Sequence, residues 1–70
     1  MKATDLTYDQ QWDAAKTMET YGGGFASALA QAFFRADLTN ARRILTAFDD
    51  LFLRYHRWNE EEKEKANENK

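Results

Sequence analysis

An uncharged stretch between Glu19 and Arg35 constrains the fold of this chain most. It opens with the segment Tyr21-Gly22-Gly23-Gly24-Phe25, which holds every glycine of the protein, and continues into a run rich in alanine and phenylalanine. Consecutive glycines interrupt a helix and let backbones approach closely, whereas alanine favours a new helix after them. We therefore predict a first helix that ends near Thr20, a glycine turn, and a second helix over about 24–36.

Helix is favoured in the rest of the chain as well, because proline is absent and β-branched residues other than threonine are scarce. Thr7 and Gln10 have the spacing of a capping box, so the first helix is expected to begin after Thr7. Asp37 either ends the second helix or caps a third, which the apolar spacing over 41–55 indicates. We expect an all-α fold, a compact three-helix protomer with a long C-terminal helix.

The sequence leaves open whether that last helix is continuous. It could run unbroken from Leu38 to past Trp58, or it could restart at Asp49-Asp50, since aspartate is a good capping residue.

A chain of 70 residues allows a single domain. Residues 59–70 contain five acids, three lysines and one alanine, so we expect a folded domain over 1–58 and a charged tail over 59–70, which is either a solvated helix turn or disordered. The remainder has seven acidic and seven basic residues, a balance that argues against binding to polymeric nucleic acid. No segment has the length and apolarity of a membrane span or the pattern of a signal peptide, so cytoplasmic residence is expected.

The second predicted helix is apolar over roughly 240° of its circumference. Two partner helices within one chain cover only part of such a surface, so the excess predicts a homo-oligomer with a second protomer against this helix. The expected interface residues are Phe25, Ala26, Leu29, Ala30, Phe33 and Phe34.

The glycine turn is the first candidate for a binding site, because free N–H groups at a helix start attract phosphate. The alternative is a tight turn or a close helix crossing that needs glycine for structural reasons alone. Walker and Rossmann patterns are absent, which argues against a nucleoside triphosphatase or a dinucleotide dehydrogenase.

A ladder of side chains four residues apart on the first helix, formed by Tyr8, Trp12, Lys16 and Thr20, and a group of arginines are the other candidates. The ladder could stack a base and contact a phosphate, or its aromatic members could be core residues. Arg43, Arg54 and Arg57 could grip phosphate, or Asp50 and Arg54 could form an ordinary ion pair one helical turn apart. The candidate ligand-binding set is Tyr8, Trp12, Lys16, Thr20, Tyr21, Gly22, Gly23, Gly24, Ser27 and Arg43.

An enzyme is not expected from these residues. Cysteine is absent, and His56 is the single histidine with no nearby nucleophile in the sequence. No pair of groups suited to general acid and base catalysis can be assembled, and no metal site or cofactor is predicted.

Part of the sequence resembles small helical proteins of tailed bacteriophages, and among them the anti-CBASS cyclic-oligonucleotide sponge family. The resemblance covers roughly residues 20–56. It rests on Tyr21-Gly22-Gly23-Gly24-Phe25, Ala28-Leu29-Ala30, Ala36-Asp37, Asn40-Ala41-Arg42, Ala47-Phe48, Leu51-Phe52 and Tyr55.

This resemblance implies a hexamer in the cytoplasm of an infected cell. Such proteins sequester cyclic dinucleotides and cyclic trinucleotides, the second messengers of bacterial immunity, without cleaving them, and hold them between protomers. Two other functions remain open from the sequence. One is a small helical adaptor or inhibitor that binds a host or phage protein through the surface of the second helix, and the other is a structural component of the virion.

Overall fold

The computed structural model describes the backbone of residues 1–68 and the side chains of residues 1–65. All regular structure in this part of the chain is helical, which confirms the all-α prediction. The elements are a short 3-10 helix Ala3–Asp5, α1 Tyr8–Tyr21, α2 Gly23–Arg35, α3 Leu38–Ala47 and α4 Asp49–Glu68. The expectation of three helices is corrected to four α-helices over these residues, because the predicted third helix is divided.

The division lies at Phe48, whose backbone leaves the helical region (φ −117°, ψ 38°). The Phe48 carbonyl accepts hydrogen bonds from the amides of Leu51 and Phe52 at 3.1 and 3.2 Å, which begins α4. The Asp49 carboxylate accepts a hydrogen bond from the Ala3 amide. This contact ties the start of α4 to the amino-terminal 3-10 helix, a partner that no local sequence signal reveals.

Two helix starts predicted from the sequence are confirmed. The Thr7 hydroxyl accepts from the Gln10 amide at 3.1 Å, and the Gln10 side chain accepts from the Thr7 amide at 2.9 Å, which completes the capping box of α1. Asp37 caps α3, since its carboxylate accepts from the Asn40 amide at 2.8 Å.

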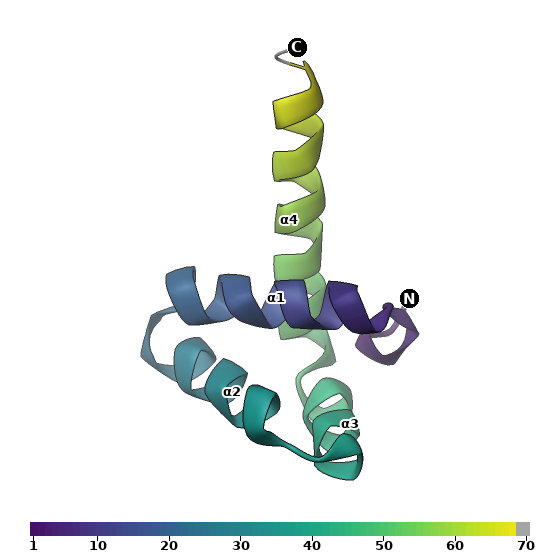
Figure 1. The fold of residues 1–70 in the computed structure, drawn as a ribbon, viewed down its shortest axis with the longest axis vertical. Coiled ribbons are helices and arrows are strands. Elements are labelled where there is room, and N and C mark those ends of the chain that lie inside the picture. Colours follow the sequence, from purple (N-terminus) through teal and green to yellow (C-terminus); the bar gives the residue numbers. More distant parts are fainter. Residues whose placement is uncertain (69–70) are drawn as a thin grey trace.

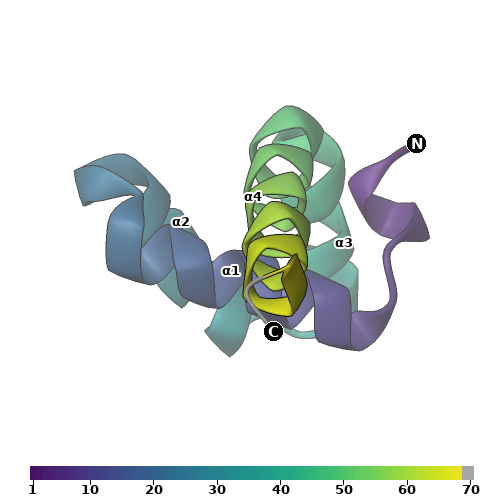
Figure 2. The same cartoon turned by 90° about the horizontal axis from the view of Figure 1, so that it is seen from above.

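The helices are arranged around α1, which crosses α4 while α2 folds back beneath it (Figure 1). Seen along α4, α2 and the amino-terminal 3-10 helix lie on opposite sides of that helix (Figure 2). Met18 and Phe52 are fully buried where these elements meet, and the Phe33 ring lies 5.3 Å from the Phe52 ring. Small side chains line the contacts of α1 with its neighbours, namely Ala14, Ala15, Ala26 and Ala30.

The α2 helix is better covered within one chain than its composition suggests. Of the expected interface residues, Ala26, Ala30 and Phe33 are buried in the core of the single chain, so they are not on the surface that a second copy could contact. Leu29 and Phe34 pack partly buried against that core. Phe25 is the large exception, because it remains 65% exposed beside the Phe48 ring.

The α4 helix continues past the expected domain boundary and projects beyond α1 (Figure 1). Asn59 accepts a hydrogen bond from the Thr17 hydroxyl of α1 at 2.7 Å. The separation of a charged tail over 59–70 stays a prediction, and its last two residues lie outside the described part of the chain. No helix among the described residues is long and apolar enough to cross a bilayer.

The fold requires glycine at two positions of the turn. A Cβ at Gly22 would collide with the Met18 carbonyl and the Ala26 side chain, so α1 and α2 can meet there only if Gly22 has no side chain. Gly23 has φ +75°, a conformation that glycine adopts without strain. A Cβ at Gly24 would meet nothing within 4 Å, so the fold gives no reason for glycine at that position.

We therefore predict opposite effects of one methyl group at two adjacent sites. Gly22→Ala is expected to lower the free energy of unfolding by about 2 kcal/mol through overpacking. Gly24→Ala is expected to raise it by about 0.5–1 kcal/mol, because alanine loses less backbone entropy in a helix. Urea denaturation followed by circular dichroism measures both, and equal effects would contradict the close crossing at Gly22.

A truncation tests where the folded domain ends. Deleting residues 60–70 is expected to change the free energy of unfolding by less than about 0.5 kcal/mol, since alanine is the one apolar residue in the sequence of that segment. Ending the chain after Tyr55 also removes Trp58 and Asn59, and we expect it to be clearly destabilising. Thermal unfolding of the two truncated chains distinguishes these outcomes, and unfolding of the longer one would place the boundary further along α4.

Candidate functional site

The amino-terminal end of α2 offers backbone donors to solvent. Gly22 is the N-cap and supplies no side-chain acceptor, so the N–H groups of the first turn have no capping partner from that residue. Gly23 and Gly24 are exposed. This end of α2 therefore has the local chemistry of an anion site, although the geometry of Gly22 and Gly23 is also required by the fold itself.

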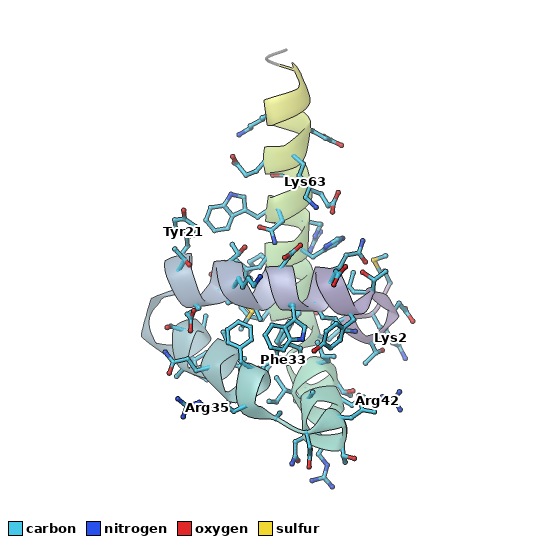
Figure 3. The ribbon with its side chains drawn as sticks, in the orientation of Figure 1. Lys2, Tyr21, Phe33, Arg35, Arg42 and Lys63 are labelled. Atoms are coloured by element: carbon cyan, nitrogen blue, oxygen red, sulfur yellow. The ribbon has the colours of Figure 1, made fainter. Side chains whose placement is uncertain are left out.

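An aromatic group stands beside this turn. Tyr21, the last residue of α1, is 67% exposed, and its ring lies 5.0 Å from the indole of Trp58 on α4. Trp58 in turn lies 5.8 Å from the Tyr55 ring. Figure 3 shows Tyr21 rising from the end of α1 on the side of α4. The three rings form an aromatic edge at the end of α1, on its α4 side, whereas α2 runs beneath α1 (Figure 1).

Two arginines extend the aromatic edge along α4. Arg54 and Arg57 line a shallow concavity together with Tyr55, Trp58 and Glu61. Among the described side chains, ion pairs join only Lys63 with Glu60 and Lys65 with Glu62, so the alternative of an Asp50–Arg54 pair is wrong. Both guanidinium groups are thus available to a ligand, and the edge combines π surfaces with positive charge.

Tyr55 and Trp58 were not among the predicted ligand-binding residues. Their spacing of three places them on one side of α4, and this was visible in the sequence. Their proximity to Tyr21 depends on the crossing of α1 over α4, a tertiary contact that helical spacing alone does not predict.

The structure does not bring the predicted ladder of α1 together as one site. Trp12 packs partly buried against the core, with its ring 4.7 Å from Phe34 and 6.0 Å from Phe33. Tyr8 is 66% exposed but lies about 18 Å along the helix axis from Thr20, further than one mononucleotide reaches. The Thr20 hydroxyl donates its proton to the Lys16 carbonyl, which leaves it no donor for a phosphate.

The other predicted site residues are also dispersed. Lys16 is exposed and lines a groove with Thr17, Asn59 and Glu62, between α1 and α4. Ser27 is half-buried one turn into α2 from Gly24. Arg43 lies on α3, beyond the break at Phe48, and therefore does not share a helix face with Arg54 and Arg57. Of the candidate set, Tyr21 and the three glycines are the members that lie together.

Comparison with protein-family models, with curated proteins and with solved structures found no match to this chain. The resemblance to phage sponge proteins therefore remains a prediction from the quoted residues. In the described side chains, no group of three or more histidine, aspartate or glutamate residues is placed to hold a metal ion.

Replacement by alanine is expected to have very different effects on the free energy of unfolding at the two aromatic residues at the start of α1. Trp12→Ala should lower the free energy of unfolding by about 3 kcal/mol, because the ring packs against two phenylalanines. Tyr8→Ala should change it by less than about 1 kcal/mol, since that ring is mostly exposed. Chemical denaturation of both variants tests this. A Trp12→Ala protein as stable as the unmodified one would show that Trp12 is a surface residue without a packing role.

Proposed function

We propose that this protein is a binding protein without catalytic activity, which sequesters cyclic di- and trinucleotides at protomer boundaries of an oligomer. In that role it would block CBASS immunity during phage infection. The observation that carries the proposal is the pair formed by the exposed Tyr21 ring and the half-buried Trp58 indole, 5.0 Å apart, at the end of α1 that leads into the uncapped start of α2.

The chemistry of this edge suits a nucleotide. Exposed amides at a helix start favour a phosphate, and a tyrosine–tryptophan pair supplies π surface for a base. Arg54 and Arg57, on the same stretch of α4 as Trp58, add two guanidinium groups that can each form paired hydrogen bonds with a phosphate. Binding of this kind needs no general acid or base.

The single chain leaves the edge open, whereas ligand sites usually enclose most of their ligand. A second protomer would supply the missing wall. The exposed residues of α2 next to the turn, Phe25, Ala28 and Ala32, offer apolar surface for that contact. A ligand held between two chains would stabilise the oligomer by mass action.

Thermal shift measurements with cyclic dinucleotides and cyclic trinucleotides test the proposal, with linear dinucleotides of the same bases as controls. Ligand at about 100 times its dissociation constant should contribute about 2.7 kcal/mol, which raises the melting temperature by several degrees. Tyr21→Ala should abolish the shift, because it removes the exposed half of the aromatic pair. The matched control is Tyr8→Ala, which removes an equally exposed tyrosine at the far end of α1.

Gly24→Ala separates a role of the turn in binding from its role in folding. The added methyl group meets no protein atom, so the fold is retained, but it would obstruct a phosphate at the α2 amides. We expect the apparent affinity for the nucleotide, measured from the thermal shift, to fall at least fivefold. Two outcomes would contradict the proposal. One is the absence of a thermal shift in the unmodified protein at high micromolar ligand, and the other is an unchanged shift in Tyr21→Ala.

The exposure of Phe25 favours a second candidate, an adaptor or inhibitor that binds a host or phage protein through α2. Light scattering on the free protein distinguishes the two. A monomer in dilute solution that does not respond to nucleotides would favour the adaptor, whereas an oligomer stabilised by cyclic nucleotides would favour sequestration.

A further inference from the structure

Three adjoining shallow depressions form one continuous trough along α3 and α4. The first lies on α3 between Leu38 and Ala47, the second spans the helix break to Arg54, and the third follows α4 to Glu61. Thr46 and Ala47 line both the first and the second, and Arg54 lines both the second and the third. The shared residues make the three depressions one surface.

The trough carries most of the arginines of the chain. All five arginines of the sequence lie between residues 35 and 57, and four of them line the trough, namely Arg42, Arg43, Arg54 and Arg57. All four are exposed, and the ion pairs found among the described side chains involve lysines instead. Asp49, at the helix break, is already hydrogen-bonded to the Ala3 amide. The four guanidinium groups of the trough form no ion pair with a described side chain, and they outnumber the acids that also line it, Asp49, Asp50 and Glu61.

Apolar side chains are interspersed with these arginines. Leu38 is 75% exposed at one end of the trough, and Phe25 is 65% exposed on the wall beside the helix break. Leu51 and Trp58 are half-buried further along α4. Leu38 and Phe25 therefore give the first and the second depression one exposed apolar contact point each. Apolar anchors flanked by charge are the pattern of a groove that receives an amphipathic helix.

We propose that this trough docks an acidic amphipathic helix of a partner protein. The apolar face of the partner helix covers Leu38 and Leu51, and its flanking glutamates or aspartates pair with Arg42, Arg43, Arg54 and Arg57. Arginine suits this role because its planar fork matches a carboxylate. The interaction goes beyond nucleotide sequestration, because the α3 part of the trough, with Leu38, Arg42 and Arg43, lies outside the edge proposed for nucleotides, whereas Arg54, Arg57 and Trp58 belong to both.

Charge and apolar pattern distinguish this partner from two other occupants. A nucleic acid matches the arginines with its phosphates, but it has no aliphatic side chains to cover Leu38 and Leu51. The acidic segment 60–65 of a second copy matches the charge, but it contains no apolar residue to cover Leu38. An amphipathic acidic helix satisfies both demands.

The test measures binding of a synthetic helix to the full-length protein by fluorescence anisotropy. The probe is a labelled peptide of about 18 residues, long enough for about 27 Å of helix, with leucines at i, i+4, i+7 and i+11 and flanking glutamates. Binding should weaken as salt rises, because the pairs are exposed. Replacing the glutamates of the probe by lysine, or its leucines by serine, should each abolish binding.

Arg42→Glu and Arg54→Glu should each weaken binding of the probe at least tenfold. Arg35→Glu is the matched control, because Arg35 is also an exposed arginine, at the end of α2, and lies outside the trough. Figure 3 shows Arg35 and Arg42 extending away from the body on different helices. The control should change affinity less than twofold, and circular dichroism verifies that each variant is folded.

Four outcomes would overturn the proposal. These are no binding of the probe at about 100 µM, an equal loss in the Arg35→Glu control, tighter binding of a single-stranded oligonucleotide, and self-association abolished by Arg42→Glu. The last two would assign the trough to a nucleic acid or to a second copy. Arg42→Glu should retain the nucleotide shift and Tyr21→Ala should retain the peptide, so failure of this proposal is distinguishable from failure of the proposed function.

Discussion

The close crossing of α1 and α2 at Gly22 is the contact on which the remaining packing depends. Gly22 donates its amide to the Met18 carbonyl at 2.8 Å, and the absence of a side chain lets Ala26 approach the same point. The chain then reverses within a single residue between two helices. Ala26 meets α1 at this close approach, Trp12 packs on Phe33 and Phe34 further along the two helices, and Met18 and Phe52 are fully buried in the same core. A domain of this size, without cysteine, relies on such dense helix packing for its stability.

The break at Phe48 is the second constraint, and it shapes the surface rather than the core. An unbroken helix over 38–68 would place its arginines on one straight face. The break instead sets α3 at a separate position, and the bend between α3 and α4 becomes part of a concave surface next to Phe25. The contact of Asp49 with the Ala3 amide holds this geometry, so the first residues of the chain help to determine the shape of a surface formed by its second half.

Features encoded by short-range chemistry could be predicted from the sequence, and features that depend on tertiary partners could not. The caps at Thr7 and Asp37 and the interruption at the glycines each follow from a few neighbouring residues. The break at Phe48 was one of two open alternatives, because neither proline nor glycine marks it and the apolar spacing fits both. The ladder on α1 failed for a related reason: periodicity places Tyr8 and Trp12 on one side of a helix but does not show that Phe33 and Phe34 cover only Trp12.

Residues of the candidate site that the fold requires can be separated from those for which it gives no reason. Gly22 and Gly23 are required by the crossing and by a positive φ, so their presence needs no ligand to explain it. Gly24 and Tyr21 have no such structural role, because a side chain at 24 would point into open space and the Tyr21 ring is mostly exposed. Much of the apolar surplus of α2 is likewise absorbed by the core, which leaves Phe25 as its large exposed residue. Since Phe25 packs on Phe48 at the wall of the trough, the surplus that first indicated a self-associating helix also belongs to the surface that α3 and α4 present to a partner.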